Sequence, residues 1–332
     1  MTTTFIPPLE QAQVKPLGSA SIKNLPVNLF GSVMGLAGLG LGWRLAHQYF
    51  GVSPLIGEAI GLFAALVFVA LGVGYLAKLL RHRQAVINEF THPIAGNFFG
   101  TIVIAILLLS VVAGPYSEVL AQGLWTVGSV LTLLLGGLVL SRLFNGKQEL
   151  QHAVPAWLIP GVATLDVAVT GGHMPMAWAA ELNLFAMAIG AALALIFFTS
   201  IFPRLVHQEA LAKPMIPSLM ILVAPFEVGF LAYTNLFGID RFAALLFYFG
   251  LFLAIVVGFK VFRRDVHFAP SWWAISFPLA ALASAALKYA HEQGSLPLQL
   301  IAWASLLFLS AALAVLTFKT LSSLVRGKLL AG

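Results

Sequence analysis

Residues 271–290, SWWAISFPLAALASAALKYA, are the stretch from which the fold of this chain can best be predicted. About 20 mainly apolar residues are enough to cross the roughly 30 Å hydrocarbon core of a bilayer. Pro278 removes a backbone donor directly after Phe277, so we expect a kink near mid-span. At helical spacing, one face carries Trp273, Phe277, Ala281, Ser284 and Lys288. A single ring followed by small residues suits the wall of a narrow passage, and the alternative is that Phe277 packs between helices.

The composition of the whole chain indicates a polytopic helical membrane protein. Of its 332 residues, 60% are hydrophobic and 9% charged, and the mean hydropathy is +0.96. Ordinary soluble domains are about 25% charged. A soluble enzyme with a large core is therefore excluded, and the absence of cysteine excludes disulfides and thiol chemistry.

Ten apolar spans can be assigned along the chain, and the loops between them are too short to hold a soluble domain. The predicted spans are 26–50, 54–81, 94–113, 117–143, 156–171, 175–203, 217–236, 239–262, 270–291 and 296–324. The expected organisation is an N-terminal segment at 1–25, a membrane domain at 26–324 and a C-terminal tail at 325–332.

The basic residues predict the orientation of these spans. All but three of the 18 lysines and arginines fall on one side of a ten-span topology, the exceptions being Arg44, Arg241 and Lys288. By the positive-inside rule, both termini are expected in the cytoplasm and the protein in the plasma (inner) membrane. This asymmetry accounts for the net charge of +6, so no nucleic-acid partner is expected.

A repeated proline pattern indicates five helical hairpins in tandem. Odd-numbered spans begin beside Pro26, Pro93, Pro155, Pro217 and Pro270, roughly 60 residues apart, the length of one hairpin. Proline is tolerated in a first helical turn, where its missing donor would have no partner anyway. Prolines simply favour helix starts, but five in the same phase indicate a repeat.

Odd and even spans also differ in character. The odd spans carry glycines, prolines and acids, whereas the even spans are long aliphatic and aromatic runs that suit contact with lipid. We therefore predict an inner ring of five odd helices forming a pore and an outer ring of five even helices. Gly31 and Gly35, two pore-lining candidates of the first span, could instead allow close helix packing.

Two acidic residues lie well inside odd spans, Asp166 in the fifth and Glu227 in the seventh. A charge there costs at least about 2.5–3.5 kcal/mol on insertion scales, so each carboxyl is expected to be protonated, paired or in contact with water. Proton coupling is one interpretation. The other is a structural carboxyl bonded to backbone groups freed by the neighbouring Pro160 or Pro225.

Signatures of enzymes are missing, so no catalytic residue, cofactor or metal is predicted. The eight histidines fall mostly near the ends of spans without metal-ligand spacing. Phosphate-binding loops, nucleophile elbows and HExxH helices do not occur.

Three stretches resemble the family of slow-type anion channels and TehA (tellurite-resistance) proteins. PVNLFGSVMGLAGLGLGW at 26–43 is similar to that family's opening helix, IPSLMILVAPFEVGFLAY at 216–233 to its seventh helix, and 272–290 to its ninth. The resemblance implies ten helices, a pore of five kinked inner helices, and a homotrimer with one pore per subunit. It also implies that Phe277 is the gate and that Gly31 lies on the pore wall.

Further pore-lining candidates are Pro225, Pro278, Ala281 and Ser284, together with Asp166 and Glu227. Glu227 departs from the small or apolar residues that many members of the family carry there. The predicted function is a channel for small monovalent anions such as chloride and nitrate, with membrane lipids as the other partners. The alternative is a proton-coupled carrier or exporter of C4-dicarboxylates, sulfite or tellurite oxyanions.

Arg44 and Lys288 are predicted to lie at the outer mouth of this pore. Each falls near the outer end of an odd span, and two cations in a low-dielectric funnel would concentrate anions there. The alternatives are that both side chains extend to lipid headgroups or pair with Glu58, Asp240 or Glu292.

Overall fold

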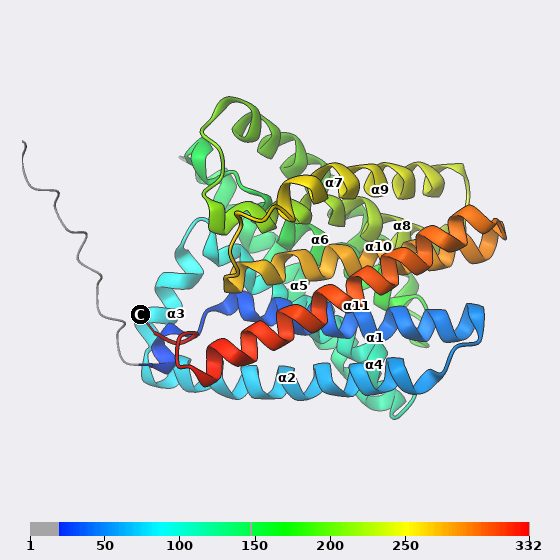
Figure 1. The fold of residues 1–332 in the computed structure, drawn as a ribbon, viewed down its shortest axis with the longest axis horizontal. Coiled ribbons are helices and arrows are strands. Elements are labelled where there is room, and N and C mark those ends of the chain that lie inside the picture. Colours follow the sequence, from blue (N-terminus) through cyan, green and yellow to red (C-terminus); the bar gives the residue numbers. More distant parts are fainter. Residues whose placement is uncertain (1–19, 147, 332) are drawn as a thin grey trace, which may run out of the picture.

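The computed structural model describes residues 20–146 and 148–331, so most of the predicted N-terminal segment and residue 332 lie outside the described residues. The described part is all-helical and contains eleven α-helices joined by short 3-10 segments, labelled η. The long helices run along the horizontal axis of Figure 1. The α-helices are α1 Phe30–Phe50, α2 Pro54–Arg81, α3 Arg83–Thr91, α4 Gly100–Ala113, α5 Glu118–Phe144, α6 Leu158–Gly171, α7 Ala179–His207, α8 Ala224–Phe237, α9 Arg241–Val261, α10 Ser276–Gln293 and α11 Leu296–Val325.

Nine helical segments in the described residues are long and apolar enough to cross a bilayer. They correspond to nine of the ten predicted spans. The predicted span at 156–171 is α6 with the preceding 3-10 turn η5, Pro155–Trp157, and it is shorter than the others. Almost all of this segment is buried among other helices, so its length need not match the thickness of the lipid.

The two ends of the described chain lie at the same end of the bundle, shown on the left in Figure 1. The backbone N–H of Ser21 donates to the carbonyl of Leu330 at 3.1 Å, and the Asn24 amide donates to the same carbonyl at 2.9 Å. We call this end of the bundle the inner end and the opposite one the outer end.

The proline repeat corresponds to a repeated change of helix type. Helices α1, α4, α6, α8 and α10, here called the inner helices, each begin from a 3-10 segment that contains or follows one of the repeated prolines. These segments are η2 Val27–Leu29, η3 Ala95–Phe99, η5 Pro155–Trp157, η6 Lys213–Val223 and η7 Pro270–Ile275. The 3-10 segments are tighter than the α-helices that follow, and a proline at their start removes no needed donor.

Pro278 does not kink the middle of its span as predicted. It is the third residue of α10, directly after the 3-10 segment η7. Pro160 in α6 and Pro225 in α8 occupy the same first turn. In that turn the missing N–H has no partner within the helix in any case, so the irregularity is the change from 3-10 to α-helix.

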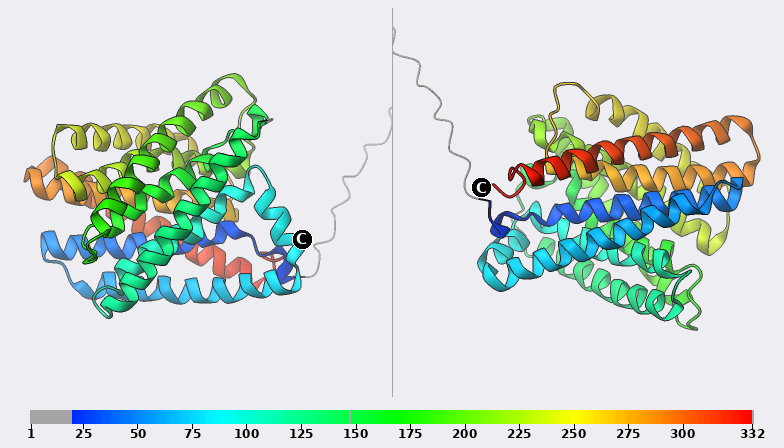
Figure 2. Two further views of the ribbon diagram at one scale, coloured as in Figure 1. Left: turned by 180° about the vertical axis from the view of Figure 1, so that it is seen from behind. Right: turned by 60° about the horizontal axis from the view of Figure 1, so that its bottom comes forward.

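Contacts between the helices follow two patterns. Each inner helix packs against the helix that follows it among α2, α5, α7, α9 and α11, here called the outer helices. The inner helices also contact one another in a closed cycle, α1 with α4, α4 with α6, α6 with α8, α8 with α10, and α10 with α1. Figure 2 shows α1 between α2 and the α10–α11 pair.

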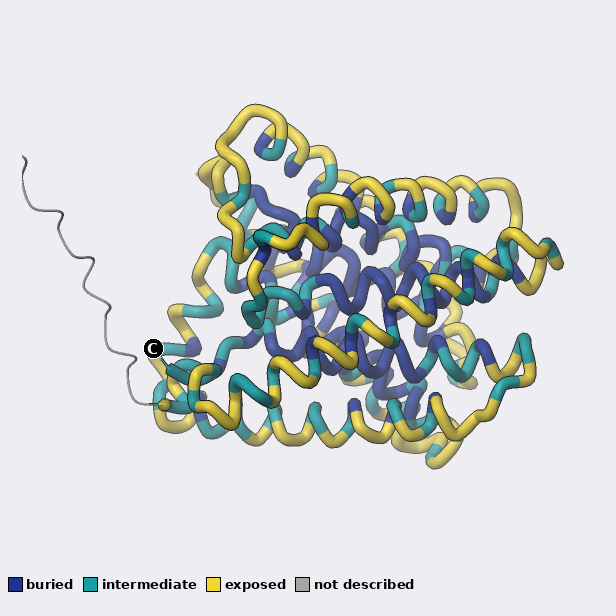
Figure 3. The backbone as a smooth tube through the Cα atoms, in the orientation of Figure 1, coloured by how far each residue is buried: buried dark blue, intermediate teal, exposed yellow. Residues whose placement is uncertain are grey.

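Burial separates the two groups of helices. In the most apolar stretch of each span, 67–78% of residues are buried in α1, α4, α8 and α10, against 17–33% in the outer helices. The buried tube in Figure 3 accordingly follows the middle of the bundle, and the exposed parts lie around it. The outer helices expose large apolar side chains such as Leu66, Leu134 and Phe259, the surface that lipid requires.

The short helix α3 was not predicted, and it anchors the start of α1 through Glu89. The Glu89 carboxylate accepts from the backbone N–H of Val27 at 2.8 Å, from the Tyr75 hydroxyl at 2.8 Å and from Lys78 Nζ at 2.6 Å. Lys78 is buried and also donates to the Leu25 carbonyl at 2.8 Å. The buried charge therefore has partners on both sides.

Helices α1 and α10 approach each other closely because small residues meet. The Ser276 hydroxyl donates to the carbonyls of Gly31 at 2.9 Å and Trp273 at 2.7 Å. A Cβ atom on Gly35 would lie 2.4 Å from the Cβ of Ser276, and one on Gly38 would lie 2.7 Å from the Cβ of Ala280. No side chain larger than hydrogen fits at Gly35 without moving α10.

Gly35→Ala should therefore destabilise the protein by about 1–3 kcal/mol, the usual cost of overpacking a core. The matched control is Gly72→Ala on α2, where an added Cβ meets nothing within 4 Å and the higher helix propensity of alanine stabilises. Thermal unfolding in detergent measures both variants. Equal melting temperatures for the two would contradict the close packing of α1 on α10.

Candidate functional site

Two of the cavities in the described part of the chain follow one another between the inner helices. The inner cavity is lined by Asn28, Gly31, Met34, Phe98, Thr101, Ile104, Ile159, Val162, Ile221, Ala224, Pro270, Ser271, Trp273, Ala274, Phe277 and Pro278. The outer cavity is lined by Gly38, Leu41, Arg44, Leu45, Gln48, Tyr49, Leu108, Val111, Asp166, Val169, Thr170, His173, Val228, Leu231, Asn235, Phe277, Ala280, Ala281, Ser284 and Lys288. Phe277 is the one residue that lines both, so its side chain lies where the two cavities meet.

Each inner helix lines both cavities with a single face. On α6 the lining residues are Ile159 and Val162 for the inner cavity, then Asp166, Val169 and Thr170 for the outer one, and His173 follows two residues after the helix. Steps of three and four residues keep side chains on one face of an α-helix. The η6–α8 segment shows the same spacing through Ile221, Ala224, Val228, Leu231 and Asn235. The two cavities therefore lie in line along the same faces of the inner helices.

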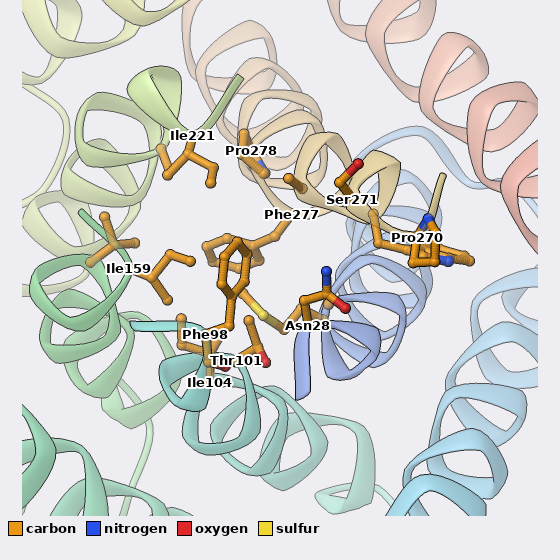
Figure 4. Close-up of a pocket in the computed structure, with 16 residues that line it drawn as sticks. Asn28, Phe98, Thr101, Ile104, Ile159, Ile221, Pro270, Ser271, Phe277 and Pro278 are labelled. Carbon is orange, nitrogen blue, oxygen red and sulfur yellow. Dashed lines mark hydrogen bonds between the residues drawn. The ribbon is translucent and has the colours of Figure 1, made fainter. Parts of the chain in front are cut away.

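The inner cavity is small and mainly apolar. In Figure 4, Phe277 and Phe98 project toward the middle of the space between the helices, with Ile159, Ile221 and Thr101 around them. The cavity volume is about 40 Å³ here and about 330 Å³ in the outer cavity. One water needs about 10–15 Å³ of such space. The inner cavity has room for only a few waters, and none of the residues that line it is ionisable.

Arg44 lines the outer cavity, but its charge is compensated. Its guanidinium donates to both carboxylate oxygens of Glu58, from Nε at 2.8 Å and from Nη2 at 2.7 Å. It also donates to the carbonyls of Val111 and Val112, each at 2.9 Å. Glu58 was one of the pairing partners considered from the sequence, and this network joins the outer ends of α1, α2 and α4.

Lys288 also lines the outer cavity, and its charge has no carboxylate partner within 4 Å among the described residues. Its ammonium group donates to Asn235 Oδ1 at 2.8 Å. The Asn235 amide donates in turn to the carbonyl of Val169 at 2.8 Å near the end of α6. A neutral amide thus fixes the position of Lys288 and leaves its positive charge facing the cavity.

Asp166 and Glu227, the two acids predicted inside the membrane, lie in different surroundings. Asp166 is 1% exposed and lines the outer cavity, and its Oδ2 atom has no hydrogen-bond partner in the described residues. Glu227 is 0% exposed and lines neither cavity. Its carboxyl packs against α9, where a Cβ on Gly250 would lie 2.2 Å from Oε1. Neither Glu227 oxygen has a hydrogen-bond partner among the described residues, so the predicted bond to freed backbone groups is not found there.

The remaining candidates divide in the same way. Gly31 and Pro278 line the inner cavity, and Ala281 and Ser284 line the outer one. Gly35 and Pro225 line neither, and Gly35 serves the contact between α1 and α10. Phe98, Asn28 and Asn235 line the cavities but were missed. The sequence signal that could have found them is the spacing of three and four residues that marks one face of each odd span. In the seventh span this spacing places Val228 on the lining face and Glu227 off it.

A comparison with protein families shows which family this chain is related to. The family model described as SLAC1, voltage-dependent anion channel, matches residues 24–321. The chain belongs to this family. It is a multi-pass membrane protein of an anion-channel family, and the predicted resemblance is confirmed.

Individual relatives include both branches of the predicted resemblance. The chain is 29% identical over 279 residues to the S-type anion channel SLAH2 of Arabidopsis thaliana, covering 80% of this chain and 53% of that one. To the guard cell S-type anion channel SLAC1 of the same plant it is 28% identical over 309 residues, covering 88% and 54%. It thus spans about half the length of these plant relatives. A tellurite resistance protein TehA homolog of Haemophilus influenzae is 25% identical over 317 residues, with 92% of each chain covered.

Proposed function

We propose that this chain forms a channel for small monovalent anions, gated by Phe277. The proposal is based on the observation that the side chain of Phe277 lines both of the cavities between the five inner helices. An aromatic ring at the junction of two cavities interrupts the path of an ion. Displacement of this ring would join them.

The proposed architecture has ten crossings, with the inner helices forming a pore and the outer helices surrounding it. Both ends of the described chain lie at one end of the bundle, which supports an even number of crossings with α6 as the tenth. The cycle of contacts among the inner helices supports the ring. We further propose inner-membrane location, cytoplasmic termini, surrounding lipids as partners, and a homotrimer with one pore per subunit.

Selection among anions would follow from the two cavities. Lys288 attracts an anion into the outer cavity because its charge has no acidic partner there. The inner cavity offers few polar groups and little room for water. An anion must therefore lose most of its hydration shell, which favours weakly hydrated monovalent ions such as chloride and nitrate over multiply charged ones.

A second candidate function is a proton-coupled carrier or exporter of C4-dicarboxylates, sulfite or tellurite oxyanions. One observation favours it, the carboxyl of Asp166 on the wall of the outer cavity. Reversal potentials measured in a planar bilayer, with and without a pH gradient, distinguish the channel from the proton-coupled carrier. A current driven by the pH gradient alone would favour the carrier.

Phe277→Ala should raise the anion conductance at least about tenfold, equivalent to a barrier about 1.4 kcal/mol lower. Removal of the ring joins the two cavities. Single-channel recording with symmetric chloride or nitrate measures the change. The control is Phe226→Ala on α8, a half-buried ring that packs against Phe198 and Phe249 and lines neither cavity. A well-folded Phe277→Ala protein with the conductance of the unaltered chain would refute the gate.

Lys288→Gln, introduced together with Phe277→Ala, should lower the current at low ionic strength and leave it unchanged at high ionic strength. Salt screens the attraction of an accessible charge with a Debye length of about 10 Å at 0.1 M. Arg44→Gln is the comparison, because Arg44 is paired with Glu58. Its expected effect is a loss of stability of about 2 kcal/mol, the scale of hydrogen bonds to a charged group. Currents from Lys288→Gln that are reduced equally at every salt concentration would contradict electrostatic attraction.

A further inference from the structure

Asp166 has a position in the path that no other acidic residue of the described chain shares. Val162, one turn earlier on α6, lines the inner cavity, and Asp166 is the first residue of α6 to line the outer one. Its level is therefore next to that of Phe277, where the cavities meet. Lys288 lies eleven residues beyond Phe277 on α10, about 16 Å along the axis at 1.5 Å per residue. An anion from the outer side meets Lys288 first and Asp166 before it reaches the gate.

The surroundings of Asp166 leave its charge uncompensated. The nearly fully buried carboxyl has one oxygen without any hydrogen-bond partner, and none of the ion pairs in the described residues includes it. A carboxylate here would repel an anion beside it in a space of low dielectric. A protonated carboxyl would be neutral and could donate a hydrogen bond to the anion.

From this geometry we propose that the outer cavity binds a proton on Asp166 together with the permeating anion. The carboxylate takes the proton from the outer solution, and the resulting O–H group faces the cavity. The anion, drawn into the cavity by the ammonium group of Lys288, then meets this neutral donor before it reaches Phe277. When the proton leaves, the restored negative charge expels the anion and closes the approach to Phe277. The proposal rests on the proposed function and adds external acidity as a condition for conduction.

Few other groups could produce a response to outer pH. The ionisable residues that line the outer cavity besides Asp166 are Arg44 and Tyr49 on α1, His173 next to α6 and Lys288 on α10. Arg44 is bound to Glu58. The parts of α4 and α8 that line the cavity carry none, nor do η3 and η5. On the far sides of α6, the buried Ser129 and Thr132 of α5 and Asn183 of α7 are not ionisable.

No other charged residue of the neighbouring elements in the described chain lines the outer cavity. Arg204 of α7 donates to backbone carbonyls of Gln151 and Glu209, and Lys213 of η6 bridges to Asp265 at 3.5 Å. Glu227 of α8 faces Gly250. His173 is thus the main competitor, because it is an ionisable residue that lines the same cavity.

The test is a planar-bilayer recording of Phe277→Ala channels in symmetric chloride, with the pH of each side varied separately between about 8 and 5. Acidification of the outer side should raise the current at least about tenfold, and acidification of the inner side should not. Asp166→Asn in the same background should give the high current at every outer pH, because an amide is neutral and donates hydrogen bonds. Asp166→Ser serves if the asparagine variant fails to fold in detergent.

Two matched variants make the assignment to Asp166 specific. His173→Gln and Glu227→Gln, each with Phe277→Ala, should keep the full response to outer pH. A current independent of outer pH, a response that survives in Asp166→Asn, or one that disappears in His173→Gln would each overturn the proposal. A complete absence of anion current from Phe277→Ala at every pH would refute the pore itself, whereas a pH-independent current would refute only the proton site.

Discussion

Backbone hydrogen-bonding groups cannot be left without partners in hydrocarbon, and this constraint explains the two layers of the bundle. The inner helices start with 3-10 turns beside prolines and pack closely through glycines, as at Gly35 against Ser276. Such irregular backbone is tolerated only inside protein. The outer helices are long and regular and expose large apolar side chains. The same irregular starts that must be kept from lipid line the inner cavity, so the constraint also determines where a path can form.

Charged groups within the bundle fall into two classes according to their partners. Lys78 with Glu89, and Arg44 with Glu58, form hydrogen-bonded pairs that join neighbouring helices. Removal of one partner would leave an uncompensated charge in a region of low dielectric. Lys288 and Asp166 line the outer cavity and have no charged partner in the part of the chain that the structure describes. The paired charges support the structure, and our proposals assign the two unpaired groups of the outer cavity to an ion, whereas Glu227 lines neither cavity.

Hydropathy and the phase of the prolines allowed nine candidate membrane spans, the short helix of the fifth span and the repeated helix pairs to be predicted, because each depends on local sequence. Spacing along 271–290 also identified Phe277, Ala281, Ser284 and Lys288 as one face, and all four line the outer cavity. Helix α3 was missed because its nine residues are not apolar enough to stand out. The position of Pro278 was misjudged because composition does not distinguish a 3-10 segment from the first part of an α-helix. Glu227 was assigned to the pore on its depth alone, and only the contact with Gly250 reveals which way it faces.

The central claim, that Phe277 separates an inner from an outer cavity, can be measured directly because the chain contains no cysteine. Ala274 and Ala281 lie about one turn on either side of Phe277 and line the inner and outer cavity respectively. Single cysteines at these positions can be labelled in sealed vesicles with a membrane-impermeant thiol reagent applied to one side. The account predicts that Ala274→Cys reacts only from the inner side and Ala281→Cys only from the outer side, and that Phe277→Ala makes both react from either side. Labelling of both positions from the same side with Phe277 in place, or sidedness unchanged by Phe277→Ala, would contradict it.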